Sequence, residues 1–403
     1  MIFFRLHNGL SADFAIFALW EGALEREDEI IADIGSKFEV RANFLIYWSD
    51  EHYARNMQRL YEIPGSVPSF SGYSPKLGKP PFRVIVVKDK NPIYTWKRSV
   101  SGVIEPTNER IVAAKYRYRE LFEKKYQVHS TNNIDEYLFQ SNLLLGPEIV
   151  DQILNSDGLL EGNLYRDLEG AEGWRDWKHV FSILNSCCRY LVLRNFEYLP
   201  DRIEDEDIDF LTDNMQRLAS VANIEQIKKQ KYKGKICISG SRVQADIRFI
   251  GDHYFDSQWQ LNCLHRRRKL RGLYVPAMAD HFFTLLYHCK VHKKIVKSKY
   301  IELLGAMSEQ MRFEWFDPGR LGDDLAMGEI LAGYYRSNGY YYQHPVDSGV
   351  GRNLDVIRKL PAVYTDNGGR LKQNIRRGRK LVAAVLRDPW KVPRSFRQRL
   401  VRG

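Results

Sequence analysis

Residues 207–211 read Asp-Ile-Asp-Phe-Leu, and residues 242–250 read Arg-Val-Gln-Ala-Asp-Ile-Arg-Phe-Ile. In the first segment an apolar residue separates two aspartates, a pattern typical of a β-strand end where both carboxylates point to one side and Ile208 enters the core. The second segment alternates apolar and polar side chains, which predicts a strand with Asp246 on its polar face. If the two strands are neighbours, three carboxylates converge: Asp207, Asp209 and Asp246.

Three carboxylates held together repel one another, and they are stable mainly when divalent cations lie between them. Mg²⁺ (or Mn²⁺) prefers hard oxygen ligands and bridges nucleotide phosphates, so the expected donor substrate is a nucleoside triphosphate. Two such ions can stabilise both the attacking and the leaving oxygen of an in-line displacement. We therefore expect Asp207 and Asp209 to hold the metal. Asp246 would complete one metal site and help to deprotonate the acceptor hydroxyl.

Residues 188–295 resemble the nucleotidyltransferase superfamily of the polymerase-β type. That family carries a turn with a hydrophobic residue followed by Gly-Ser or Gly-Gly, then two aspartates around a hydrophobic residue, and a third aspartate on a later strand. Here Leu193-Arg194-Asn195 precedes the pair and Asp246 follows it. The resemblance implies a nucleotidyltransferase-like α/β domain over 188–300, with Arg194 and Asn195 at the phosphate-binding turn. Because Arg-Asn replaces Gly-Ser, contact between Arg194 and an anion is the alternative.

The first part of the chain alternates apolar strands with amphipathic helices. Ser49 and Asn133 are good helix N-caps, and the almost purely apolar run 82–87 is typical of a central, buried strand. This order predicts a ferredoxin-like α+β domain over residues 1–147. The expected elements are strands at 13–20, 43–48 and 82–87, and helices at 26–38, 49–62, 109–125 and 133–145.

Val128-His129-Ser130-Thr131, followed by the helix that Asn133 caps, resembles the nucleoside diphosphate kinases, whose catalytic histidine lies in a His-Gly-Ser-Asp-Ser turn. The resemblance is loose and covers residues 13–146. It implies that His129 is a phosphate-accepting nucleophile. Trp20-Glu21-Gly22 stands where that family has Lys-Pro-Asp, so we expect kinase activity of that type to be lost or replaced. The alternative is that His129 is a polar loop residue before a helix.

The remaining segments give weaker patterns. We expect a mainly helical connector at 148–187 and a helical, aromatic extension at 301–369. Within a helix predicted at 277–293, three histidines share one face, which is more typical of a core edge than of a site beside the carboxylates: His281, His288 and His292. The five cysteines are odd in number and form no Cys-x-x-Cys pair, which predicts reduced thiols.

The net charge of +11 comes from the end of the chain. Residues 370–403 hold twelve Lys and Arg residues and one acidic residue, Asp388, which leaves 49 basic and 49 acidic residues before them. In this tail, basic side chains alternate with Leu, Val and Trp, a mixture that suits an interfacial helix on an anionic membrane surface. Nucleic-acid binding is the competing interpretation, and a merely solvated tail is the third.

No apolar run is long enough to span a bilayer. We therefore expect a cytoplasmic protein, peripheral at the inner face of the membrane through 370–403. The expected function is metal-dependent nucleotidyl or phosphoryl transfer to a small-molecule or glycan acceptor. The resemblance suggests a sugar or sugar-phosphate acceptor in surface-polysaccharide biosynthesis. The alternatives are a nucleotidyltransferase acting on nucleic acid and a non-catalytic binding module that retains the fold.

Overall fold

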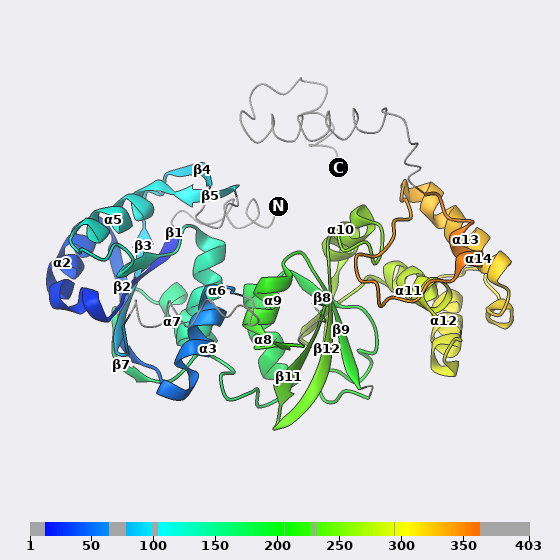
Figure 1. Ribbon diagram of the computed structural model, residues 1–403, viewed down its shortest axis with the longest axis horizontal. Helices are drawn as coiled ribbons and strands as arrows, with labels where there is room; N and C mark the ends of the chain where they lie inside the picture. Colours follow the sequence, from blue (N-terminus) through cyan, green and yellow to red (C-terminus); the bar gives the residue numbers. More distant parts are fainter. Residues whose placement is uncertain are drawn as a thin grey trace, which may run out of the picture.

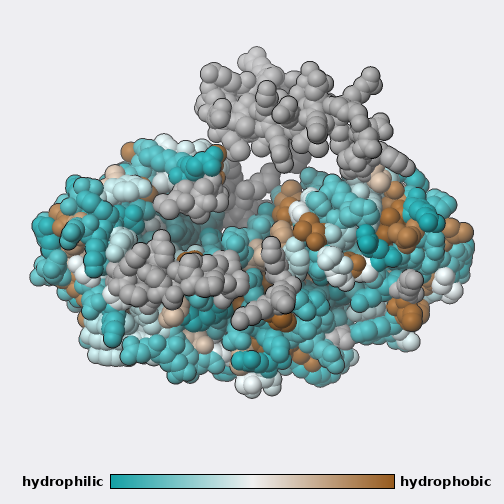
Figure 2. Space-filling model, in the orientation of Figure 1, coloured by the Kyte–Doolittle hydropathy of each residue, from teal (hydrophilic) through white to brown (hydrophobic). Residues whose placement is uncertain are grey.

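A computed structural model describes residues 13–63, 78–98, 104–204, 206–227, 230, 232–293 and 295–362. The predicted α+β class is confirmed. The basic tail predicted at 370–403, with its membrane and nucleic-acid interpretations, lies outside the described residues. No helix within the described ranges is both long enough and apolar enough to cross a lipid bilayer. The face shown in Figure 2 is hydrophilic over most of its described surface.

The first sheet has the strand order β6-β1-β3-β2-β7. Its strands are β1 (Asp13–Leu19), β2 (Glu39–Tyr47), β3 (Phe82–Asp89), β6 (Val128–Ser130) and β7 (Leu160–Tyr165). The pairs β6–β1, β1–β3 and β3–β2 are antiparallel, whereas β7 is parallel to β2. The segment predicted to be a central strand, β3, is therefore in the middle of this sheet.

Helices cover both faces of this sheet, which explains why the middle parts of β1 and β3 are apolar on both sides. Phe17 and Val87 pack in one cluster with α2 (Glu27–Lys37) and α5 (Glu109–Glu120). Ile16 and Val86 pack in another cluster with α3 (Asp50–Leu60), α6 (Ile134–Leu145) and α7 (Pro147–Asn155). Neighbouring residues of one strand therefore belong to different cores, because side chains alternate across a sheet.

The predicted helix starts are confirmed. The Ser49 hydroxyl accepts a hydrogen bond from the amide of His52, and the Asn133 side chain accepts one from the amide of Glu136. Helix α5 ends at Glu120, before the expected position 125. The prediction also missed a short 3₁₀ helix, η1 (Glu21–Arg26), and a hairpin of β4 (Tyr94–Arg98) and β5 (Ile104–Asn108).

The segment 148–187 is not simply a helical connector. It contains α7 and α8 (Trp177–Cys187), but between them β7 adds a strand to the edge of the first sheet, beside β2. Most side chains of β7 are exposed. Backbone hydrogen bonds to β2 hold such a strand, so it carries no apolar alternation that a sequence pattern could reveal.

The central sheet has the order β10-β11-β12-β9-β8. Its strands are β8 (Tyr190–Val192), β9 (Asp207–Thr212), β10 (Glu225–Gln226), β11 (Lys233–Ile238) and β12 (Ser241–Phe249). Strands β9 and β12 are parallel, and the other pairs are antiparallel. Ile208 and Phe210 point to the face that packs with α8 and α9 (Met215–Val221), in the same cluster as Ile16. The first and central sheets thus share one continuous core.

The opposite face of the central sheet packs against the C-terminal helices. Leu193 and Leu211 lie in one cluster with Trp259 and Leu286. Its helices are α10 (Ser257–Arg266), α11 (Met278–Tyr287), which continues into the π-helical turn η3 (His288–His292), α12 (Ser298–Gln310), α13 (Asp324–Asn338) and α14 (Leu354–Ile357). A 3₁₀ turn, η4 (Pro318–Arg320), and a hairpin of β13 (Arg268–Leu270) and β14 (Leu273–Val275) complete the described elements.

These elements form successive layers (Figure 1). From left to right the figure shows α2 with α5, the first sheet, a helical layer that includes α3, α6, α8 and α9, the central sheet, and the helices α10–α14. We call the first sheet, together with α2, α3, α5, α6 and α7, the first unit. The central unit is the central sheet with α8 and α9, and the C-terminal unit is α10–α14. All five cysteines are free thiols, as expected.

Candidate functional site

The parallel pairing of β9 and β12 brings the predicted carboxylates together. Their register places Asp246 opposite Asp209 and Gln244 opposite Asp207. One carboxylate oxygen from each of Asp207, Asp209 and Asp246 lies within 4.8 Å of the others. The predicted convergence is therefore confirmed, and it depends on a pairing between strands that are far apart in the sequence.

The three carboxylates lie on the face of the central sheet that looks toward the C-terminal unit. Asp209 is two residues before Leu211 on β9, so both side chains share the face that packs against α10 and α11. Asp209 and Asp246 are buried, whereas Asp207 is partly exposed. The Asp207 side chain makes no hydrogen bond or ion pair with another described residue. Solvent and ligands therefore have access from the side of Asp207.

Arg194, predicted at the phosphate-binding turn, reaches the carboxylates directly. It follows β8, and the amide of the preceding Leu193 donates a hydrogen bond to the Asp209 carbonyl. The Nη2 atom of Arg194 lies 2.6 Å from Oδ1 of Asp209, and both side chains are buried. Although burial lowers the pKa of Arg194, the charge of Asp209 raises it above its ordinary value. The guanidinium is therefore a fixed cation at the edge of the cluster.

Asn195 forms the turn itself. Its φ of 59° is in the left-handed region, which asparagine and glycine adopt more readily than other residues. Its Oδ1 atom accepts a hydrogen bond of 3.3 Å from the Tyr300 hydroxyl on α12. Asn195 thus provides the backbone conformation for a tight turn, and a contact with the C-terminal unit fixes its side chain.

The sequence analysis missed two further cations at the cluster. Lys233 lies opposite Asp246 on β11, with Nζ 3.4 Å from Oδ2 of Asp246. The Nη2 atom of Arg248 lies 3.8 Å from the same oxygen, and its Nη1 donates to Asp347 at 2.9 Å. The alternation in β12 puts Arg248 on the face of Asp246, so it could have been found. Lys233 is on the neighbouring strand and Asp347 is on a distant segment, and neither gave a signal in the sequence.

Attraction to the cations and repulsion between the carboxylates oppose each other at Asp209. Burial and the neighbouring carboxylates of Asp207 and Asp246 raise the pKa of Asp209 to about 6, against the opposing charge of Arg194. Three side-chain cations therefore do not fully offset the desolvation and mutual repulsion of the acidic groups. A divalent cation held by these oxygens would offset both the desolvation and the repulsion.

The three histidines predicted on one helical face are all buried beside this region. The Nδ1 atom of His288 lies 3.0 Å from the Tyr254 hydroxyl, and the Arg248 guanidinium lies over the Tyr254 ring at 4.4 Å. Neither ring nitrogen of His292 has a hydrogen-bond partner among the described residues. Burial lowers the pKa of His281 to about 3, and the pKa values of His288 and His292 are also lowered. We therefore read them as neutral core groups that support the site.

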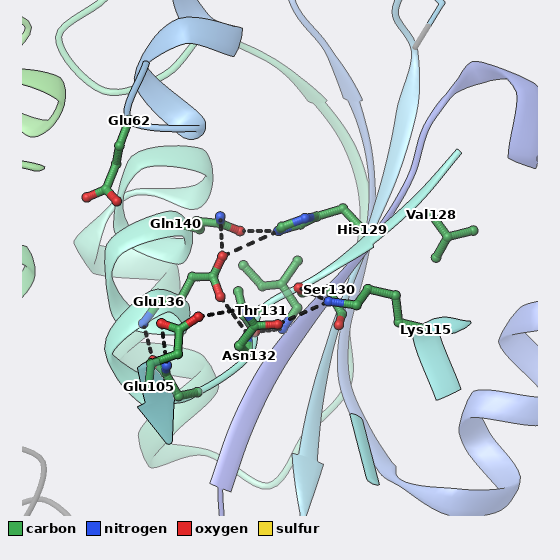
Figure 3. Close-up of polar contacts among 12 residues, drawn as sticks. Glu62, Glu105, Lys115, Val128, His129, Ser130, Thr131, Asn132, Glu136 and Gln140 are labelled. Carbon is green, nitrogen blue, oxygen red and sulfur yellow. Dashed lines mark hydrogen bonds and ion pairs between the residues drawn. The ribbon is translucent and has the colours of Figure 1, made fainter. Parts of the chain in front are cut away.

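His129 lies in a different place from the carboxylates. It is on β6 of the first unit and lines a large cavity that none of the three aspartates lines. Its Nε2 atom is 2.9 Å from Oε1 of Gln140 and 4.0 Å from Glu136 (Figure 3). Burial and the charge of Lys115 lower the pKa of His129 to about 3, so the ring is neutral near pH 7. The structure does not bring His129 together with Asp207, Asp209 and Asp246.

Glu136 beside His129 is expected to make stability depend on pH. Burial raises the pKa of Glu136 to about 7 from its ordinary value of 4.5. The folded chain then binds this proton more tightly than the unfolded chain, so the free energy of unfolding falls as the pH rises from about 4.5 to about 7. Glu136→Gln mimics the protonated acid. It should raise the free energy of unfolding at pH 8 by about 1–2 kcal/mol and leave it unchanged at pH 4. The expected gain is kept small because solvent screens a side chain that is 21% exposed.

The measurement is denaturant unfolding of the native protein and Glu136→Gln at several pH values. Glu120→Gln is a matched control, because Glu120 is on α5 with 73% of its side chain exposed. Equal stabilisation by Glu136→Gln at pH 4 and pH 8 would contradict the assignment.

No protein-family model matches the chain, and no curated protein shows significant similarity to it.

Proposed function

We propose that this chain is a metal-dependent nucleotidyl- or phosphoryl-transferase whose centre is formed by Asp207, Asp209 and Asp246. The observation that carries the proposal is the approach of these carboxylates to within 4.8 Å on one face of the central sheet. Carboxylates held this close repel one another unless cations lie between their oxygens. Carboxylate oxygens are also the ligands that Mg²⁺ and Mn²⁺ prefer.

The donor set fits a divalent cation. All three ligands are hard oxygens, and the Asp207 carboxylate has no ion-pair partner among the described residues. When bound there, the cation would stabilise negative charge on the phosphate oxygens and the reacting hydroxyl. Asp207 and Asp209 would hold it, and Asp246 would complete the site. Asp246, which Lys233 and Arg248 flank, would also accept the proton of the acceptor hydroxyl.

Arg194 adds a second function to the centre. Its guanidinium carries five N–H donors in a planar fork that matches phosphate oxygens, and only Nη2 is used by Asp209. Once a cation shares the charge of Asp209, the N–H donors that neither Asp209 nor Tyr254 uses would bind an anionic group of the donor. We therefore propose that Arg194 binds the nucleotide phosphates that a Gly-Ser turn binds in the polymerase-β type of nucleotidyltransferase.

The arrangement of the two sheets supports the proposed fold families. The order β6-β1-β3-β2 with antiparallel pairs is that of a ferredoxin-like domain, and His129 lies on its fourth strand. In the central unit, the aspartate pair on β9 and Asp246 on the adjacent β12 match the nucleotidyltransferase pattern. We propose a sugar or sugar-phosphate acceptor, as in surface-polysaccharide biosynthesis, on the resemblance alone.

A screen of nucleoside triphosphates with Mn²⁺ or Mg²⁺ and a panel of sugars and sugar phosphates tests the proposal. Turnover is measured as the release of pyrophosphate or nucleoside diphosphate. EDTA is expected to abolish this turnover. A Mn²⁺ titration in the same buffer measures metal binding directly. Turnover that persists in EDTA would contradict the proposed metal dependence.

A non-catalytic binding module is the second candidate, and one observation favours it. Arg194, at 2.6 Å from Asp209, occupies one carboxylate oxygen with a permanent cation, so the cluster could be held together without metal. The same measurements separate the two. A module shows no turnover with any donor, and its weak binding of Mn²⁺ does not change on Asp209→Asn. A metal-dependent enzyme loses most of its Mn²⁺ affinity with that substitution.

A further inference from the structure

A cavity of about 1970 Å³ lies between the first unit and the central unit. Side chains of α5, α6 and β5 line one wall, and residues around α8, the end of β9 and the β13–β14 hairpin line the other. The carboxylate cluster is on the opposite face of the central sheet and does not line this cavity. An inference about the cavity therefore does not depend on the proposed transferase function.

The two walls differ in charge. The wall from the first unit is mixed, and acidic groups such as Glu136 and Glu105 are close to Lys115 and Arg119. The opposite wall, from the central unit, the end of α10 and the β13–β14 hairpin, carries one acidic side chain among the described lining residues, Asp213. Six basic side chains line the same wall: Lys178, Arg189, Arg217, Arg267, Lys269 and Arg271. Two of them have ion-pair partners elsewhere, Arg217 with Glu62 and Lys178 with Asp201.

Two of these arginines are partly buried and incompletely paired. Arg189 precedes β8 and has only 10% of its side chain exposed, and its Nη1 atom lies 3.9 Å from Asp213. Arg267 follows α10, donates from Nη1 to the Leu264 carbonyl at 2.6 Å, and lies over the Tyr274 ring at 4.6 Å. The Nε atoms of both Arg189 and Arg267 are buried and have no hydrogen-bond partner among the described residues. Buried guanidinium donors without an acceptor are costly unless a ligand or water supplies one.

The surrounding electrostatics show an excess of positive charge. Burial and the charge of Arg189 lower the pKa of Arg267. Burial also lowers the pKa of His265, and Arg189 and Arg267 lower it further. One carboxylate, Asp213, therefore does not neutralise this pair of cations, and an added anion would lower the energy of the site.

We propose that Arg189 and Arg267 bind the phosphate group of a phosphorylated, hydroxyl-rich small molecule in this cavity. Paired guanidinium groups offer several N–H donors in the planar geometry that phosphate oxygens accept. The first-unit wall supplies the complementary polar surface. There His129, Gln140 and Glu136 form a connected network that lines the cavity with both donors and acceptors for hydroxyl groups (Figure 3). Ligand pockets usually combine an anchor for charge with such convergent polar groups.

Isothermal titration of the full chain in EDTA at fixed ionic strength tests this site. The probes are glucose 6-phosphate, inorganic phosphate and glucose. We expect both phosphate compounds to bind, glucose 6-phosphate more tightly, and glucose alone not to bind at concentrations up to about 10 mM. Arg189→Gln/Arg267→Gln should weaken the binding of glucose 6-phosphate about tenfold or more. Asp213→Asn should strengthen it a few-fold, because it removes the competing carboxylate.

Arg336→Gln is the matched control, since Arg336 is on α13 with 60% of its side chain exposed and does not line the cavity. It should bind the probes like the native protein. The proposal is overturned if neither phosphate compound binds the native chain, or if the double arginine variant binds as the native chain does. If that double variant does not fold, unchanged or weaker binding by Asp213→Asn overturns it instead. Because EDTA excludes metal at the carboxylate cluster, a negative result here is distinguishable from failure of the proposed transferase function.

Discussion

Replacing both Asp207 and Asp209 with asparagine is expected to reduce turnover by about 10³-fold or more. Asparagine keeps the size of each side chain but removes the two charges that would hold a divalent cation. The charge stabilisation that the cation supplies is worth several kcal/mol in the transition state, and each 1.4 kcal/mol corresponds to about a tenfold change in rate. The measurement is kcat with the best nucleotide donor from the screen, at saturating Mn²⁺.

A matched control comes from the residues just before β9. Glu204 and Glu206 are exposed and do not belong to the carboxylate cluster. Glu204→Gln/Glu206→Gln removes the same number of charges beside Asp207, so it should leave kcat within about a factor of two, as expected for exposed charges. An equal loss of activity in both double variants would show that the general negative charge of this segment is what matters, and would contradict the metal-binding role.

Arg194→Met is expected to produce the largest loss of stability. Arg194 and Asp209 are a buried ion pair at 2.6 Å, and removing one partner leaves an uncompensated buried charge. Such a change costs about 3–5 kcal/mol, whereas replacing both charges together is often close to neutral. The double variant Arg194→Met/Asp209→Asn should therefore recover most of the loss. Denaturant unfolding of the native chain, both single variants and the double variant completes the cycle.

The control for this cycle is an exposed ion pair. Arg320 and Asp323 lie 3.1 Å apart with 61% and 42% of their side chains exposed. Arg320→Met should cost less than about 1 kcal/mol. If Arg194→Met costs no more than Arg320→Met, the Arg194–Asp209 pair is not a buried charge pair in solution, and Arg194 would then be free to bind donor phosphates without metal.

Local sequence patterns predicted much of the fold because they report local physics. The helix starts at Ser49 and Asn133 follow from side chains that accept hydrogen bonds from the first turn. The alternation in 242–250 identified β12, and the apolar run at 82–87 identified the central strand β3. Where the pattern was missing, the prediction failed. The exposed strand β7 is held by backbone pairing with β2, which leaves no mark on its side chains.

The candidate site shows the same division. That Asp207 and Asp209 share one side of a strand is a local property of residues two positions apart. Their approach to Asp246 required the parallel pairing of β9 with β12, which only the tertiary structure establishes. The argument from repulsion treated the carboxylates in isolation. It could not foresee that Arg194 reaches Asp209 from the turn after β8, or that Lys233 reaches Asp246 from β11. Arg248, two residues after Asp246 on β12, could have been found from the alternation of that strand.

The sequence by itself determined the strands and helices that carry a periodic apolar pattern, and which of their side chains share a face, because these depend on spacing along the chain. The tertiary structure alone decided which faces meet. It placed the carboxylates toward the C-terminal unit, and it placed His129 and the Arg189–Arg267 pair around a separate cavity on the other side of the central sheet. Contacts between distant segments depend on how layers pack, and packing is set by the shapes and charges of whole surfaces, which no single stretch of sequence contains.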